Sequence, residues 1–232
     1  MKTIGLLGGM SWESTASYYA LINETVKQRL GGLHSARLLL NSIDFAEISD
    51  LQHAGDWTEL GARLTREALR LESAGADCLL LCTNTMHRVA ETIEAGLSVP
   101  LLHIADAAGA ALSAAGVSRV GLLGTRFTMQ ESFYRDRLRQ RFGLDVLVPP
   151  EAEQERVHRV IYDELCLGRI DDGSRQDYLH IIDGLQRAGA EAVILGCTEI
   201  ALLVNQQHTS VPLYDTTRLH ALEAVGFALA DA

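Results

Sequence analysis

The residues best suited to chemistry lie in two short polar turns, each of which follows an apolar run. One turn is Thr83-Asn84-Thr85-Met86-His87 and the other is Cys197-Thr198-Glu199. A thiol at the start of a helix has its thiolate stabilised by the helix dipole and by backbone amides. Cys197 is therefore the cysteine that we predict to be reactive.

Thr83 differs from Cys197 in its ability to take part in proton transfer. A hydroxyl with no strong base beside it is far less acidic than a thiol, whose free pKa is about 8.5. We expect Thr83 to donate or relay a proton and not to abstract one. The neutral donors Asn84, Thr85 and Thr198, together with helix-start amides, could hold a carboxylate.

An internal repeat relates the two turns. Gly5-Leu6-Leu7-Gly8 recurs as Gly121-Leu122-Leu123-Gly124, and Gly75-Ala76-Asp77 recurs as Gly189-Ala190-Glu191. This alignment places Thr83 on Cys197. Two half-domains facing each other across a cleft would present these side chains to one ligand from opposite sides, an arrangement that suits chemistry at a single carbon with two faces.

The first strand ends in a glycine-rich turn, Gly8-Gly9-Met10, which is followed by Ser11 at an expected helix start. Glycine allows a ligand to approach the backbone, and the helix start offers amides to an anion. The spacing is not that of the dinucleotide-binding fingerprint. A tight turn that only begins a helix is the alternative interpretation.

The remaining cysteines and histidines carry weaker signals. Cys78 and Cys82 lie in a leucine-rich strand and are predicted to be core residues, while Cys166 is uninformative. The four cysteines lack paired zinc-site spacing. His87 and His103 are candidate proton shuttles, with a structural role as the alternative.

Apolar runs bounded by glycine alternate with stretches at helical spacing, which predicts an α/β fold with parallel sheets. The strands are expected near residues 3–8, 36–42, 77–82, 100–104, 119–124, 144–148, 191–196 and 212–214. The helices are expected near residues 12–31, 57–74, 84–95, 105–115, 128–142, 150–168, 173–188, 198–203 and 216–230. We predict two pseudo-symmetric half-domains, each a parallel-sheet α/β sandwich. Residues 1–100 form the first, joined by a returning helix at about 216–232, and residues 101–215 form the second, with the active site in the cleft between them.

Composition excludes several classes of protein. The chain has 232 residues, of which 47% are hydrophobic, and a formal net charge of -10. This acidity argues against a nucleic-acid partner, which requires clustered Lys and Arg. No apolar run is long enough to cross a bilayer, and the start of the chain has no leader pattern. We therefore expect a cytoplasmic protein with reduced thiols.

The two turns and the glycine-rich turn together resemble the aspartate/glutamate racemase superfamily. The matching residues are Gly8-Gly9-Met10, Asn84-Thr85-Met86-His87 and Gly196-Cys197-Thr198-Glu199, and they keep their order over essentially the whole chain. The chain departs from the family pattern at one position, where Thr83 replaces the first catalytic cysteine.

The resemblance implies racemisation by two residues without a pyridoxal cofactor or a metal. Cys197 would remove the α-proton of L-aspartate or L-glutamate, and Thr83 would return a proton to the opposite face. Relatives are commonly dimers, so the resemblance also implies a homodimer. The residues expected to bind substrate are Met10, Gln52, Asn84, Thr85, Thr125, Glu164, Thr198 and Glu199. Of these, Gln52 is expected in a loop after Asp44-Phe45-Ala46-Glu47. Thr125 is expected from the repeat, as the pseudo-symmetric mate of Gly9, to hold a carboxylate.

Two alternatives remain open. Decarboxylases of substituted malonates in the same superfamily keep only the second-half cysteine and use it to protonate a carbanion, which also fits Thr83. The match at Asn84-Thr85-Met86-His87 disfavours this interpretation. The other alternative is a relative that binds an amino acid without catalysis, against which the intact Gly-Cys-Thr-Glu turn argues.

Overall fold

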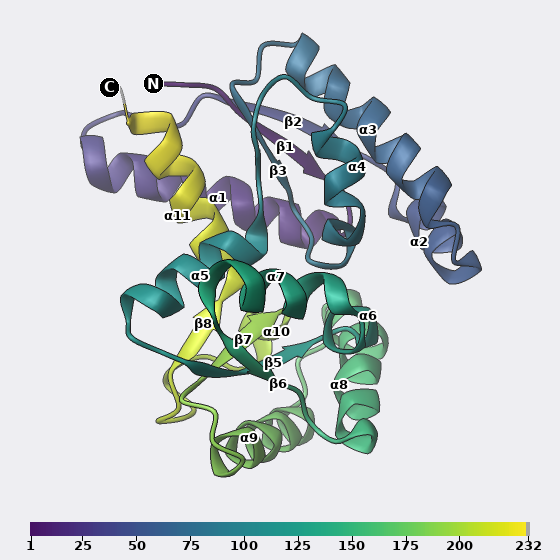
Figure 1. The fold of residues 1–232 in the computed structure, drawn as a ribbon. Coiled ribbons are helices and arrows are strands. Elements are labelled where there is room, and N and C mark those ends of the chain that lie inside the picture. Colours follow the sequence, from purple (N-terminus) through teal and green to yellow (C-terminus); the bar gives the residue numbers. More distant parts are fainter. Residues whose placement is uncertain (231–232) are drawn as a thin grey trace. The chain divides into compact units, whose positions relative to one another are not determined.

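The chain forms two units, each built on a parallel four-stranded sheet (Figure 1). A computed structural model describes residues 1–230, so residues 231 and 232 of the predicted first half-domain lie outside the described part. One unit contains Met1–Ile104 and the segment that begins at His220, and the other contains Ala105–Leu219. The predicted α/β fold with two parallel-sheet halves is confirmed.

The first unit has the strand order β2-β1-β3-β4. Its strands are β1 (Ile4–Gly8), β2 (Leu38–Ser42), β3 (Cys78–Leu81) and β4 (Leu101–Leu102). Its helices are α1 (Trp12–Leu30), α2 (Phe45–Ala54), α3 (Trp57–Ser73), the 3₁₀ helix η1 (Thr85–Val89), α4 (Ala90–Glu94) and most of α11 (Thr216–Leu229).

The second unit repeats this topology with the order β6-β5-β7-β8. Its strands are β5 (Arg119–Gly124), β6 (Asp145–Leu147), β7 (Ala192–Gly196) and β8 (Leu213–Asp215). Its helices are α5 (Ile104–Ala114), α6 (Arg126–Gln130), α7 (Ser132–Phe142), α8 (Glu151–Asp163), η2 (Leu165–Leu167), α9 (Asp172–Arg187) and α10 (Ile200–Leu203). The equivalent strand order explains the sequence repeat, because each copy encodes the same sheet.

Side-chain alternation divides the core of the first unit into two layers. Ile4 and Leu6 of β1 pack with α1 and α11 on one face, while Leu7 packs with α2, α3 and α4 on the other. Figure 1 shows α11 crossing α1 within this unit, and residues of both helices pack in one cluster. Cys78 and Cys82 are fully buried in the α1 layer, which confirms that they are core residues.

Some expected elements differ from the sequence prediction, among them the helix expected at 150–168, which is α8 followed by the separate 3₁₀ helix η2. Residues 45–54 form helix α2 and not a loop, because the Asp44 side chain accepts a hydrogen bond from the Ala46 amide and Gly55 ends the helix in a left-handed conformation. The helix expected at 128–142 is broken into α6 and α7 at Glu131, whose backbone is extended. The helix expected at 84–95 begins as η1.

Across residues 1–230, no helix is long and apolar enough to span a bilayer. The same part of the chain contains no group of three His, Cys, Asp or Glu side chains arranged to hold a metal ion.

Candidate active site

The glycine-rich turn after β1 is closely packed. Gly9 has φ of 90°, and a Cβ added there would lie 2.1 Å from the Ile43 carbonyl oxygen. The Gly9 amide donates to Thr15 Oγ1 at 2.8 Å, and this hydroxyl donates to the Ser11 carbonyl at 2.9 Å. The Met10 side chain is buried in the core of the first unit. Its role in substrate binding stays a prediction.

Thr83 lies beyond the carboxyl end of β3, beside this turn. β1 and β3 are parallel neighbours with Leu7 opposite Leu81, so the two turns share one edge of the sheet. Thr83, Asn84 and Thr85 are all buried, with exposed fractions of 9%, 4% and 7%. The Thr83 hydroxyl makes no hydrogen bond to a described residue of this unit, and its role as a proton donor stays a prediction.

Gln52 lies on α2, and its side chain is buried. The prediction that it lies in a loop is wrong, because the Asp44 cap and the Gly55 end make this segment helical. Its role as a substrate ligand remains a prediction.

Cys197 follows β7 in the second unit and forms a close pair with Glu199. Its Sγ donates to Glu199 Oε2 at 2.9 Å, and the Thr198 hydroxyl donates to the same oxygen at 2.7 Å. Glu199 is buried, with 5% exposed, while Cys197 is partly buried. The carboxylate thus accepts hydrogen bonds from both neighbouring side chains, the thiol and the Thr198 hydroxyl.

The predicted stabilisation of the Cys197 thiolate is wrong for this structure. Burial raises the pKa of the thiol well above its usual value, and the negative charge of Glu199 raises it further. Only the Glu199 backbone amide opposes these effects, and its contribution is the smallest. Helix α10 begins at Ile200 and has four residues, so it offers little compensating dipole. The resting thiol is therefore protonated.

Thr125 lies close to Cys197 at the same sheet edge. Gly124 pairs with Gly196 across β5 and β7, and a Cβ on Gly124 would meet the Gly196 carbonyl at 2.9 Å. Thr125 and Cys197 each follow one of these paired glycines. The Thr125 side chain accepts a hydrogen bond from the Thr128 amide and so caps α6. The paired strands therefore bring together Thr125, Cys197, Thr198 and Glu199.

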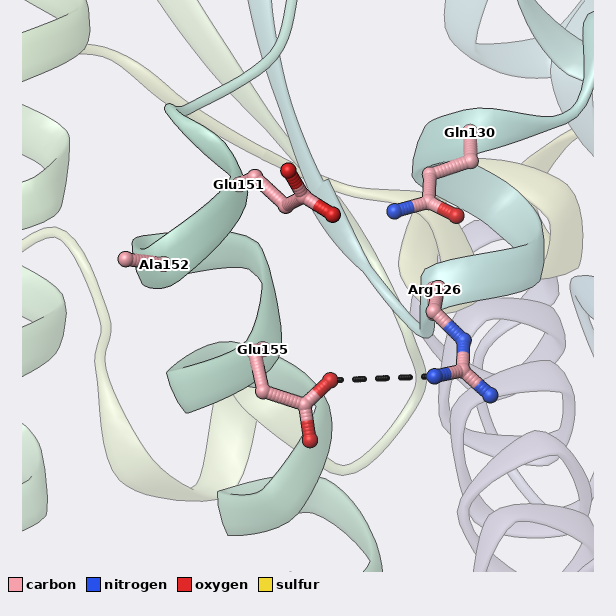
Figure 2. A pocket seen from close by; sticks show the side chains of 5 residues that line it. All are labelled: Arg126, Gln130, Glu151, Ala152 and Glu155. Carbon is pink, nitrogen blue, oxygen red and sulfur yellow. Dashed lines mark ion pairs between the residues drawn. The ribbon is translucent and has the colours of Figure 1, made fainter.

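A surface hollow of about 570 Å³ is lined by Arg126, the residue that directly follows Thr125 in the sequence, and by residues of α6 and α8. Figure 2 shows Arg126 and Gln130 of α6 facing Glu151 and Glu155 of α8 across it. The Arg126 guanidinium is half exposed and lies 3.8 Å from Glu155. Arg126 is the single cationic residue among those lining this hollow. It was not predicted from the sequence, because an isolated arginine forms no recognisable motif.

Glu164 belongs to a network that joins α8 to α9. It accepts from the Ser174 hydroxyl at 2.6 Å and lies 3.7 Å from Arg156. Arg156 also donates to Asp177 at 2.7 Å, and this hydrogen bond raises the pKa of the arginine. These contacts give Glu164 a structural role, while its contact with substrate stays a prediction.

Both units of the chain match one known protein family. The family model described as Asp/Glu/hydantoin racemase matches residues 7–224, which include residues 83–87 and 197–199 of the two polar turns. The chain belongs to the Asp/Glu/hydantoin racemase family.

Relatives of this racemase-family chain have been characterised in structure and sequence. It is 51% identical to an Asp/Glu racemase candidate from Yersinia pestis, with a TM-score of 0.93 over 99% of this chain and 100% of that one. It is 33% identical to an aspartate racemase homologue from Pyrococcus horikoshii, with a TM-score of 0.86 over 98% and 99% of the two chains. The broad specificity amino-acid racemase RacX from Bacillus subtilis is 22% identical over 98% of each chain.

Proposed function

We propose that this protein is a cofactor-independent racemase that acts on L-aspartate and L-glutamate. The observation that carries the proposal is the Cys197–Glu199 pair in the Gly-Cys-Thr-Glu turn, where a thiol has a carboxylate acceptor at 2.9 Å. The name of the Bacillus subtilis relative supports an amino-acid substrate. The name of the Pyrococcus horikoshii relative supports an acidic one.

Cys197 acts on one face of the substrate. Transfer of its proton to Glu199 produces a thiolate, which then removes the α-proton of the L-isomer and becomes a thiol again. Burial and the Glu199 charge disfavour the thiolate, so the transfer costs free energy but makes the thiolate more basic once formed.

Thr83 supplies the proton to the opposite face. Its hydroxyl bond breaks as the α-carbon gains hydrogen, and water then returns a proton to the threonine oxygen. The proton held by Glu199 passes to the hydroxide that this leaves, which restores the resting protonation states. Thr83 is a poor base for the reverse direction. The free enantiomers have equal energy, so kcat/KM must nevertheless be equal in both directions, and the asymmetry can appear only in kcat and KM separately.

Arg126 provides the positive charge for the second carboxylate of an acidic substrate. It directly follows Thr125 in the chain and forms a long, half-exposed ion pair with Glu155 at 3.8 Å, which a substrate carboxylate would have to displace. A hydrogen bond to a charged group contributes about 1.5–3 kcal/mol. Arg126→Gln should therefore raise KM for glutamate by roughly 10- to 100-fold and should leave KM for a neutral amino acid unchanged.

Solvent deuterium exchange tests the proposed function. In D2O the protein should introduce α-deuterium into L-glutamate and L-aspartate, and Cys197→Ala should abolish this exchange. Cys166→Ala is a matched control, because Cys166 packs against the same core and should leave exchange intact. Absence of exchange with the unmodified protein would exclude the racemase. A pure amino-acid-binding protein would then be indicated if glutamate raised the melting temperature without any turnover.

A decarboxylase of substituted malonates is the second candidate. The protonated Cys197 thiol favours it, because a neutral thiol can protonate a carbanion directly. Release of carbon dioxide from a substituted malonate, lost in Cys197→Ala, would support this function over racemisation.

A further inference from the structure

Three buried histidines meet beside the Thr83 turn of the first unit. His87, His103 and His220 have exposed fractions of 3%, 4% and 0%. The ring centre of His87 lies 4.4 Å from that of His103 and 5.9 Å from that of His220. The chain leaves this unit after Ile104 and returns at His220, so both connecting segments pass through the cluster.

The hydrogen bonds of His87 define its tautomer. The Ile104 amide donates to Nε2 at 3.2 Å, so Nε2 carries no hydrogen. Nδ1 must then carry the proton, and it donates to the Thr83 carbonyl at 2.8 Å. A neutral His87 thereby connects the Thr83 peptide to the first residue of α5.

His220 carries its proton on the other ring nitrogen, Nε2. Its Nε2 lies 2.8 Å from the Leu102 carbonyl, which can only accept, so Nε2 carries the proton. The Tyr18 hydroxyl, 2.8 Å from Nδ1, then donates to that nitrogen. His220 thus joins the returning segment to β4 and α1.

The Thr83 hydroxyl depends on its backbone for its direction. It makes no hydrogen bond to any described residue of this unit, so no side chain fixes it. Threonine is β-branched and stiff at χ1, which means that the backbone conformation largely determines where the hydroxyl points. The bond from His87 Nδ1 restrains that backbone at the Thr83 carbonyl.

We propose that His87 is a positioning residue, which holds the Thr83 hydroxyl in the direction from which it returns a proton to the substrate. This rests on the proposed function of Thr83. Displacement of a reacting group by about 1 Å can reduce a rate by 10²-fold. Loss of the His87 bond should therefore impair protonation on the Thr83 face while leaving exchange on the Cys197 face.

Two substitutions of His87 each keep one of its two hydrogen bonds, either the one to the Thr83 carbonyl or the one from the Ile104 amide. Asn places an amide nitrogen near the position of Nδ1, so His87→Asn should keep the bond to the Thr83 carbonyl. Gln places its amide near Nε2, so His87→Gln should keep an acceptor for the Ile104 amide and lose the bond to Thr83. His220→Gln is a control, because it disturbs the same cluster while keeping the donor to Leu102.

The readout is the fate of L-glutamate in D2O at early times. Deuterated L-glutamate reports exchange on the Cys197 face, and deuterated D-glutamate reports inversion through Thr83. His87→Gln should lower the ratio of inversion to retention by roughly 10- to 100-fold. His87→Asn and His220→Gln should keep the ratio within about twofold, even where the melting temperature falls. An unchanged ratio in His87→Gln would overturn the positioning role, whereas no exchange by the unmodified protein would refute the proposed function instead.

A measurement on the unmodified protein tests the inference without turnover. Nitrogen-15 NMR of the imidazoles should show His87 protonated at Nδ1 and His220 protonated at Nε2. A His87 protonated at Nε2 cannot donate to the Thr83 carbonyl from Nδ1 and would also overturn the proposal.

Discussion

Replacement of the buried Gly9 by alanine should be unusually costly for a glycine in a turn. Alanine at φ of 90° costs about 1–2 kcal/mol in backbone strain. The new Cβ would also lie 2.1 Å from the Ile43 carbonyl, so the two segments would have to separate by about 1 Å to reach the shortest contact that a Cβ tolerates. That separation stretches the hydrogen bond from the Ile43 amide to the Gly8 carbonyl, which is 3.1 Å long.

The magnitude follows from these three contributions. Overpacking costs about 1–3 kcal/mol, and a lost backbone hydrogen bond adds about 1 kcal/mol. Gly9→Ala should thus lower the free energy of unfolding by about 3–6 kcal/mol. Gly55→Ala is the matched control, because Gly55 has φ of 73° and nothing lies within 4 Å of an added Cβ. It should cost only the strain of about 1–2 kcal/mol.

Urea unfolding followed by far-ultraviolet circular dichroism measures both losses. Alanine also reduces the entropy of the unfolded chain, but this effect is common to the two variants and cancels in their difference. The expected difference is about 2–4 kcal/mol in favour of Gly55→Ala, by subtraction of the two estimates. Equal losses would refute the argument that contact with Ile43 requires glycine at position 9.

Three further changes test the site and the core. Thr83→Cys should raise α-deuterium exchange from D-glutamate at least about tenfold, because a thiol is a far better base than a hydroxyl; no gain would mean that residue 83 does not face the α-carbon. Glu199→Gln should lower the pKa of Cys197 by removing its neighbouring charge, so the rise of iodoacetamide alkylation with pH should move to lower pH. Burial raises the pKa of Cys78 to about 12, so the unfolded chain loses this proton first and stability should fall as pH rises from about 8.5 toward 12, by up to about 1.4 kcal/mol per pH unit. Cys78→Ala should flatten that decline in urea midpoints measured above pH 8.5.

The strand ends were predictable from the sequence because two physical rules coincide there. Buried parallel strands read as continuous apolar runs, and polar residues at their carboxyl ends gather at one edge of the sheet. The repeat then fixed the equivalence of Thr83 and Cys197, which the identical strand order of the two sheets explains. Residues on strand ends are therefore the part of the site that a single sequence reveals.

The properties that the sequence missed depend on contacts between side chains. The helix containing Gln52 depends on the Asp44 cap and on Gly55 at its end, local signals that are present in the sequence. The state of Cys197 depends on burial and on the rotamer that directs Glu199 back toward it. The burial of Cys197 and the rotamer of Glu199 do not follow from the order of residues in the turn. The stabilised thiolate expected from the sequence is therefore a protonated thiol in the structure.

The protonated Cys197 changes the way in which the Thr83 replacement limits catalysis. A resting thiol and a resting hydroxyl are both proton donors, so neither Cys197 nor Thr83 can abstract the α-proton until Glu199 accepts the thiol proton. Under the proposed racemisation, proton abstraction from the L-isomer therefore depends on Glu199, whereas a decarboxylase would need no such acceptor. If Glu199→Gln abolishes exchange with L-glutamate while alkylation of Cys197 becomes faster, the carboxylate acts as a base and not only as a hydrogen-bond partner. Loss of both would instead indicate that Glu199 merely maintains the turn.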